Sequence, residues 1–203
     1  RSFGMLGAGA IALGASLSGA APAAAATSTF RVGTLNIKND LSAADVRHDL
    51  NLIASNADLI GLQECQGSDR TAILRDWADR KGWTLFKPSG WAGECPILAR
   101  RSVFMPSSEK KAVFVCDTAG PGTVPPPRWI TRARFKHRAS GRYVTLINTH
   151  LNAGIHDDGQ PRDLPRTRDA EKHMRMVRDM AQAWQSEGQV VTIERPATRS
   201  GST

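Results

Sequence analysis

Strand-like and helix-like segments alternate along this chain, and this alternation is the feature that most limits its possible folds. A strand with alternating apolar and polar residues is predicted at 30–37, buried strands at 59–62 and 189–193, and shorter strands at 84–86, 97–99 and 112–115. Apolar residues recur at helical spacing after the capping residue Ser42, from 69 to 80 and from 166 to 186. In the last helix the predicted buried stripe comprises Ala170, Met174, Val177, Ala181 and Trp184. The pattern predicts a single domain of mixed α and β structure.

A hairpin is predicted from residues 129–136 and 142–151, which flank a turn at 139–141. The apolar residues of its first arm, expected to face the core, are Trp129, Ala133 and Phe135. The basic residues on the other face are Arg132, Arg134 and Lys136. Such a face suits contact with a phosphate backbone, but a solvated edge hairpin protected by charge explains it equally well.

Residues 1–26 are interpreted as a secretory signal peptide. The stretch from Met5 to Ala21 carries no charge, and Pro22 and a choice of Ala-Xaa-Ala cleavage sites follow it. The opening Arg1-Ser2-Phe3 looks like the tail of a twin-arginine signal that is cut at its N-terminus, since one arginine and no initiator Met are present. No second apolar segment of spanning length follows. We therefore expect a secreted bacterial protein without a stable membrane anchor.

The sequence carries 27 Lys and Arg against 19 Asp and Glu, a formal net charge of +8. This excess favours anionic partners such as nucleic acid, phosphate esters or acidic lipid head groups, although a basic surface kept for solubility is equally compatible. The cysteines are Cys65, Cys95 and Cys116. Their spacing fits no zinc site, and Cys95 with Cys116 is the preferred disulfide in an oxidising compartment, which leaves Cys65 over.

Three predicted strands end in polar residues, within TLNI (34–37), GLQE (61–64) and INTHL (147–151). A carboxylate from Glu64 and an amide oxygen from Asn36 make a hard, incomplete oxygen site that suits Mg²⁺ or Ca²⁺ completed by water and a substrate phosphate. His150 can donate to a phosphate oxygen or transfer a proton. Each residue alone has an ordinary explanation: Glu64 as a solvated strand end, His150 as a buried histidine bonded to a carbonyl, Asn36 as a turn former.

Three stretches together resemble the endonuclease/exonuclease/phosphatase superfamily, the deoxyribonuclease I-like fold: VGTLNIKN (32–39), ADLIGLQECQ (57–66) and VTLINTHLNAG (144–154). The resemblance implies an α/β four-layer sandwich of two mixed β-sheets with outer helices. It also implies that Glu64 binds a divalent metal directly, Mg²⁺ or else Mn²⁺ or Ca²⁺, and that Asn36 supports the metal and its phosphate. His150 would be the catalytic histidine that faces the phosphate.

Motifs that the superfamily carries further along the chain are absent from this sequence. No Gly-Asp-Xaa-Asn follows the strand at 189–193, and no Ser-Asp-His follows that. We therefore interpret 27–193 as a partial domain whose C-terminal strands are missing, and 194–203 as a disordered tail. Uncovered sheet edges would make the product marginally stable and prone to aggregation.

These observations lead to three hypotheses about function. The first is a secreted, monomeric, metal-dependent phosphodiesterase that hydrolyses nucleic acid and is impaired in a truncated chain. The second keeps the fold and changes the substrate to a phospholipid head group, as in sphingomyelinases, or to a small phosphate ester. The third is a non-catalytic remnant that binds polyanions through its basic hairpin.

Overall fold

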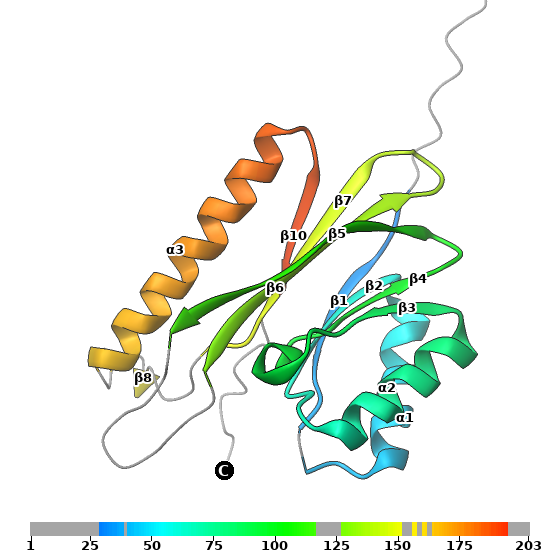
Figure 1. Ribbon diagram of the computed structural model, residues 1–203, viewed down its shortest axis with the longest axis horizontal. Coiled ribbons are helices and arrows are strands. Elements are labelled where there is room, and N and C mark those ends of the chain that lie inside the picture. Colours follow the sequence, from blue (N-terminus) through cyan, green and yellow to red (C-terminus); the bar gives the residue numbers. More distant parts are fainter. Residues whose placement is uncertain are drawn as a thin grey trace, which may run out of the picture.

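The computed structural model describes residues 29–38, 40–116, 127–151, 156–157, 160–161 and 164–194. Two four-stranded mixed sheets pack against each other, with helices on both outer sides (Figure 1). The strand order is β1-β2-β4-β3 in the first sheet and β10-β7-β6-β5 in the second. This arrangement confirms the predicted four-layer α/β sandwich.

The first sheet contains β1 (Val32–Asn36), β2 (Leu59–Gln63), β3 (Trp83–Phe86) and β4 (Ile97–Arg100). Helices α1 (Ala43–Asn56) and α2 (Ser68–Lys81) cover its outer face, and a short 3₁₀ helix, η1 (Gly90–Glu94), precedes β4. As the sequence predicts, Ser42 caps α1 by accepting from the backbone N–H of Asp45. Because β1 and β2 are parallel neighbours, their C-terminal ends lie side by side at the same end of the sheet.

The second sheet contains β5 (Phe104–Cys116), β6 (Arg128–His137), β7 (Tyr143–Thr149) and β10 (Val190–Glu194). Helix α3 (Leu164–Ser186) covers its outer face, and two short strands, β8 (His156–Asp157) and β9 (Gln160–Pro161), pair with each other. The predicted hairpin is confirmed as β6 and β7. Strand β5 begins well before the predicted 112–115, since an edge strand with a register shift after Pro106 accommodates that proline.

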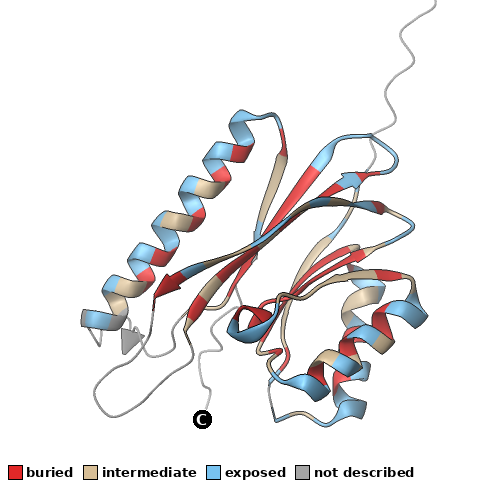
Figure 2. Ribbon diagram, in the orientation of Figure 1, coloured by how far each residue is buried: buried red, intermediate tan, exposed pale blue. Residues whose placement is uncertain are grey.

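The interior is divided into layers by the two sheets (Figure 2). Between the sheets lie Leu59, Ile97, Phe104, Ala133, Phe135 and Leu146. A second cluster lies under α1 and α2, and a third, with Ile130, Ile147, Val177 and Ala181, lies under α3. One prediction for α3 is wrong: Met174 is 40% exposed, and His173 is buried in its place. The sheet-facing stripe of α3 passes through 173, and a hydrogen bond with Thr149 of the second sheet satisfies the buried His173 ring.

The preferred Cys95–Cys116 disulfide is not formed, and no disulfide joins any of the three cysteines, which are all buried among the described residues. The reason is their placement in different layers: Cys116 packs under α3, whereas Cys95 follows η1 at the first sheet. Burial raises the pKa of the Cys65 thiol to about 12 and the pKa of Cys95 well above its usual range. Both thiols are therefore protonated and unreactive at neutral pH.

Two predicted segments fall outside the described residues: the signal peptide at 1–26, and the tail at 194–203 apart from Glu194, where β10 ends. Within the described ranges, no helix combines the length and apolar character needed to cross a membrane.

Candidate active site

Asn36 and Glu64 lie side by side where β1 and β2 end. In the parallel ladder Asn36 is opposite Gln63, the last residue of β2, so Glu64, which directly follows the strand, lies next to the Asn36 amide. Asn36 Nδ2 donates to Glu64 Oε1 at 2.8 Å. Asn36 Oδ1 is buried and has no hydrogen-bond partner among the described residues. An unpartnered amide oxygen beside a carboxylate fits a hard divalent cation, which takes oxygen ligands.

The backbone at Glu64 is unusual and explains how its side chain is aimed. Its φ of 59° is the only positive value at a non-glycine position among the described residues. The N–H of Leu62 donates to Pro96 O, whereas the next such bond is from Cys65 N to Glu94 O, so Glu64 is an extra residue on its side of the ladder. Such a bulge redirects a side chain at a strand end, and the left-handed conformation marks a site held under strain.

His150 comes to Glu64 from the other sheet, directly after β7. The preceding Asn148 fixes this strand end: its Nδ2 donates to Leu62 O at 2.8 Å and to Pro96 O at 2.9 Å, and its Oδ1 accepts from Gln63 Nε2 at 2.7 Å. His150 Nε2 then lies 3.8 Å from Glu64 Oε1. The structure therefore brings together Asn36, Glu64 and His150, the three residues that the sequence places at strand ends.

Glu94 and Arg128 complete the surroundings of His150, and sequence reasoning missed both. Glu94 Oε1 lies 2.5 Å from His150 Nδ1 and 2.7 Å from Arg128 Nη1. The Glu94 side chain is only 3% exposed. Arg128 Nη1, which can only donate, also lies 3.3 Å from His150 Nδ1. The contact with the Glu94 carboxylate, which can only accept, is much shorter and assigns the proton of a neutral imidazole to Nδ1, which leaves the Nε2 lone pair on the Glu64 side. A glutamate directly before the apolar run 95–99 was the available signal for Glu94; Arg128 offered none.

A second histidine lies behind this pair. His173 Nε2 is 2.5 Å from Thr149 Oγ1, one residue before His150. Burial, and then the nearby charge of Arg128, lowers the pKa of His173 to about 4. His173 is therefore neutral at neutral pH and acts as a hydrogen-bonding part of the core beneath α3.

Lys87 connects the segments that carry the two glutamates. Its Nζ donates to Cys65 O at 2.7 Å and to Gly93 O at 2.6 Å, next to Glu64 and Glu94 respectively. Desolvation lowers the Lys87 pKa. A Cβ at Gly93 would lie 2.6 Å from Pro88 O, so only glycine fits this close approach. The bulge after β2 and the end of η1 are thus held at a fixed separation.

The basic arm of the hairpin lies away from this group. The Arg132 guanidinium stacks 4.3 Å from the Trp184 ring of α3, and Arg134 forms an ion pair with Glu109. In the strand register Lys136 lies opposite Tyr143 at the start of β7, whereas His150 follows the other end of that strand. The structure does not bring Arg132, Arg134 or Lys136 to the Asn36–Glu64–His150 group. The three basic residues lie on the face of the second sheet that α3 covers, or near the end of that sheet far from His150.

The cation ligands that this group offers are few. Within the described ranges, no three or more His, Cys, Asp or Glu side chains gather into a metal-binding cluster. The candidate donors are one carboxylate, on Glu64, and one amide oxygen, on Asn36. This incomplete set fits Mg²⁺, which keeps several waters and binds through few protein ligands together with substrate phosphate.

Comparison with solved structures places this arrangement in a known fold. An endonuclease/exonuclease/phosphatase from Bacteroides vulgatus superposes with a TM-score of 0.57 over 85% of this chain and 67% of its own, at 17% identity. The chain has the endonuclease/exonuclease/phosphatase fold. Mannosyl-6-phosphatase Bt3783 of Bacteroides thetaiotaomicron shares this fold with a TM-score of 0.58 at 15% identity, over 82% of this chain and 64% of its own.

A third protein of the same fold, D. rerio TDP2 complexed with a single-strand DNA product, has a TM-score of 0.55 at 19% identity, over 82% of this chain and 59% of its own. This chain thus spans between 59% and 67% of the three structures. A scan of protein-family models gives no match to the sequence, and a search of curated proteins gives none.

Proposed function

We propose that this protein is a secreted, divalent-metal-dependent phosphodiesterase that hydrolyses nucleic acid. The observation that carries the proposal is the meeting of Asn36, Glu64 and His150, with the buried Asn36 Oδ1 left unpartnered beside the Glu64 carboxylate. The DNA product bound to TDP2, a protein of the same fold, supports nucleic acid as the substrate class.

The residues of the group divide the chemistry between them. Asn36 and Glu64 would hold Mg²⁺, which when bound supplies positive charge to the phosphoryl oxygens. His150 Nε2 accepts a proton from the water that attacks the phosphorus, the bond from phosphorus to the leaving oxygen breaks, and that oxygen takes a proton from solvent. Glu94, on the other ring nitrogen, fixes the tautomer and stabilises the imidazolium that results. Arg128 forms a buried ion pair with Glu94 and so holds this carboxylate against His150.

The test is hydrolysis of a supercoiled plasmid and of bis(p-nitrophenyl) phosphate with Mg²⁺ or with a chelator. We expect turnover only with metal, no turnover above background in Glu64→Gln, and a loss of about 10²-fold or more in His150→Ala because the proton acceptor is removed. Glu171→Gln, an exposed change on α3, is the control and retains full activity. Turnover that survives both the chelator and Glu64→Gln would overturn the proposal.

A small phosphate ester is the second candidate substrate, and the fold shared with a mannosyl-6-phosphatase favours it. A parallel assay of DNA, RNA, sphingomyelin and a sugar phosphate separates the substrate classes by kcat/KM. Hydrolysis of the sugar phosphate alone would replace the nuclease assignment and keep the site. Salt-sensitive DNA binding without turnover on any substrate would identify a polyanion-binding protein instead.

Export is the remaining part of the proposal, and the uncharged apolar stretch within residues 1–26 supports it. In a bacterial host we expect the chain to be cleaved near Ala26 and recovered outside the cytoplasm. N-terminal sequencing of the exported product checks this expectation, and retention of the uncleaved chain in the cytoplasm would contradict it.

A further inference from the structure

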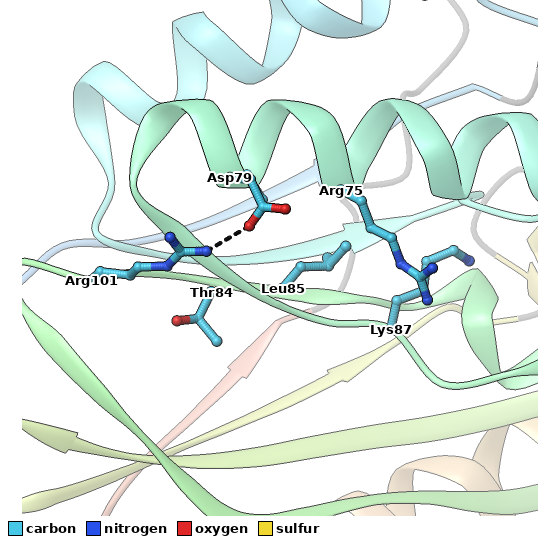
Figure 3. Close-up of a pocket in the computed structure, with 7 residues that line it drawn as sticks. Arg75, Asp79, Thr84, Leu85, Lys87 and Arg101 are labelled. Atoms are coloured by element: carbon cyan, nitrogen blue, oxygen red, sulfur yellow. Dashed lines mark hydrogen bonds and ion pairs between the residues drawn. The ribbon is translucent and has the colours of Figure 1, made fainter.

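Two adjoining hollows lie along α2. One hollow of about 500 Å³ lies between the first turn of α2 and η1, with Gln66 and Trp91 among its lining residues. A second of about 310 Å³ lies between α2 and the edge strand β3 (Figure 3). Arg75 and Lys87 line both. We call these adjoining hollows the α2 groove. Lys87, which lines both, donates to the carbonyls of Cys65 and Gly93, so the groove adjoins the segments that carry Glu64 and Glu94.

The first part of the groove offers an aromatic surface and polar groups. Trp91 on η1 is 53% exposed, which is unusual for so large an apolar ring. Gln66 Oε1 is buried without a hydrogen-bond partner among the described residues. Gly67, the N-cap of α2, lines this hollow and offers no side-chain hydrogen bond to the helix N-terminus. The positive end of the helix dipole therefore lies at the wall of the hollow. A flat aromatic face beside polar groups suits a nucleobase.

Positive charge converges where the two hollows join. Arg75 is exposed and forms no ion pair with any described residue, and Figure 3 shows its guanidinium beside Lys87. Desolvation is the main cause that lowers the Lys87 pKa, and repulsion from the nearby Arg75 charge adds to it. Arg101, at the far end, is already bonded to Asp79 at 2.7 Å. The junction at Arg75 is therefore the place in this groove that favours a phosphate.

We propose that the α2 groove binds the nucleotides next to the scissile phosphate of a single-stranded nucleic acid, with one base stacked on Trp91 and a neighbouring phosphate at Arg75. This inference rests on the proposed function and adds the path of the strand. A single strand is favoured because its unpaired base can present a face to Trp91, whereas a duplex keeps its base faces stacked. In this proposal the α2 groove, and not the basic face of Arg132, Arg134 and Lys136, contacts the nucleic acid. The two arginines of that face already contact Trp184 and Glu109.

Binding is measured first without turnover, as fluorescence anisotropy of a labelled single-stranded ten-mer in EDTA at several salt concentrations. We expect Trp91→Ala to weaken binding about tenfold, the size of one lost stacking interaction. Arg75→Glu weakens binding and flattens its salt dependence. The matched controls are Arg80→Glu, an exposed arginine on the same helix that pairs with Asp76, and Leu52→Ala, an exposed apolar residue on α1. Both controls bind like the wild type.

Turnover then separates this inference from the proposed function. Trp91→Ala and Arg75→Glu lower kcat/KM for the ten-mer and leave kcat/KM for bis(p-nitrophenyl) phosphate unchanged, because the small diester does not reach the groove. If the wild type hydrolyses both substrates and the two variants match it in binding and kinetics, the groove assignment is wrong and the proposed function stands. Loss of binding in the two variants without any wild-type turnover would retain the groove and overturn the nuclease. Equal binding of a duplex ten-mer would refute the preference for single strands.

Discussion

Two glutamates approach His150 from opposite sides, and their surroundings differ. Glu64, on the open side, is 27% exposed and contacts the neutral amide of Asn36. Glu94, on the buried side, is 3% exposed and is shared between Arg128 and His150. An exposed carboxylate with a neutral partner can exchange water for a ligand, whereas a buried carboxylate with a cationic partner fixes geometry. The comparison predicts that the two sides serve binding and positioning, respectively.

The largest expected effect is on the buried side. Glu94→Ala leaves the buried Arg128 guanidinium without its carboxylate, which costs about 3–5 kcal/mol of unfolding free energy. Urea unfolding followed by circular dichroism measures the loss. The double variant Glu94→Ala, Arg128→Met removes both charges and recovers part of it. A single variant as stable as the wild type would show that Glu94 is not the anchor of the buried side.

His173 extends the buried side and predicts its pH dependence. An unfolded histidine binds a proton below a pKa near 6.5, whereas folded His173 does so only below about 4. The unfolded state therefore binds more protons between these values, and stability falls as the pH is lowered from 6.5 to 4, by about 3 kcal/mol in total. Urea unfolding at pH 7 and pH 4 tests this in the wild type and in His173→Asn. An equal pH dependence in both proteins would contradict the assignment.

Lys87 joins the two sides, so its removal tests whether they depend on each other. In Lys87→Met the carbonyls of Cys65 and Gly93 lose a charged donor, at a cost of about 1–3 kcal/mol. We expect Mn²⁺ affinity, measured by calorimetry, to fall as well, because the bulge that aims Glu64 is released. Lys81→Met, an exposed change on α2, is the control. Lower stability with unchanged Mn²⁺ affinity would show that the sides act independently.

The same two sides show what the sequence can predict. Asn36, Glu64 and His150 are predictable because each directly ends an apolar strand run, a local pattern, and the strand ends meet once the sheets form. Glu94 and Arg128 are far from each other and from His150 in the sequence, and their contact depends on how η1 and β6 pack. The alternation of apolar and basic residues in β6 correctly predicts that Ala133 and Phe135 face the core between the sheets. It does not reveal that α3 covers the opposite face of the strand, where Arg132 stacks on Trp184.

The smallest expected effect on stability comes from the open side, and it completes the comparison. Glu64→Gln keeps the shape of the side chain and an oxygen that can accept from Asn36, so the unfolding free energy changes by less than about 1 kcal/mol. The charge that a cation requires is lost, however, and Mn²⁺ binding falls below detection in the same calorimetric titration. A Glu64→Gln protein that loses stability like Glu94→Ala and still binds Mn²⁺ would reverse the roles of the two glutamates. Retained stability with lost binding is the result that assigns the cation to the open side.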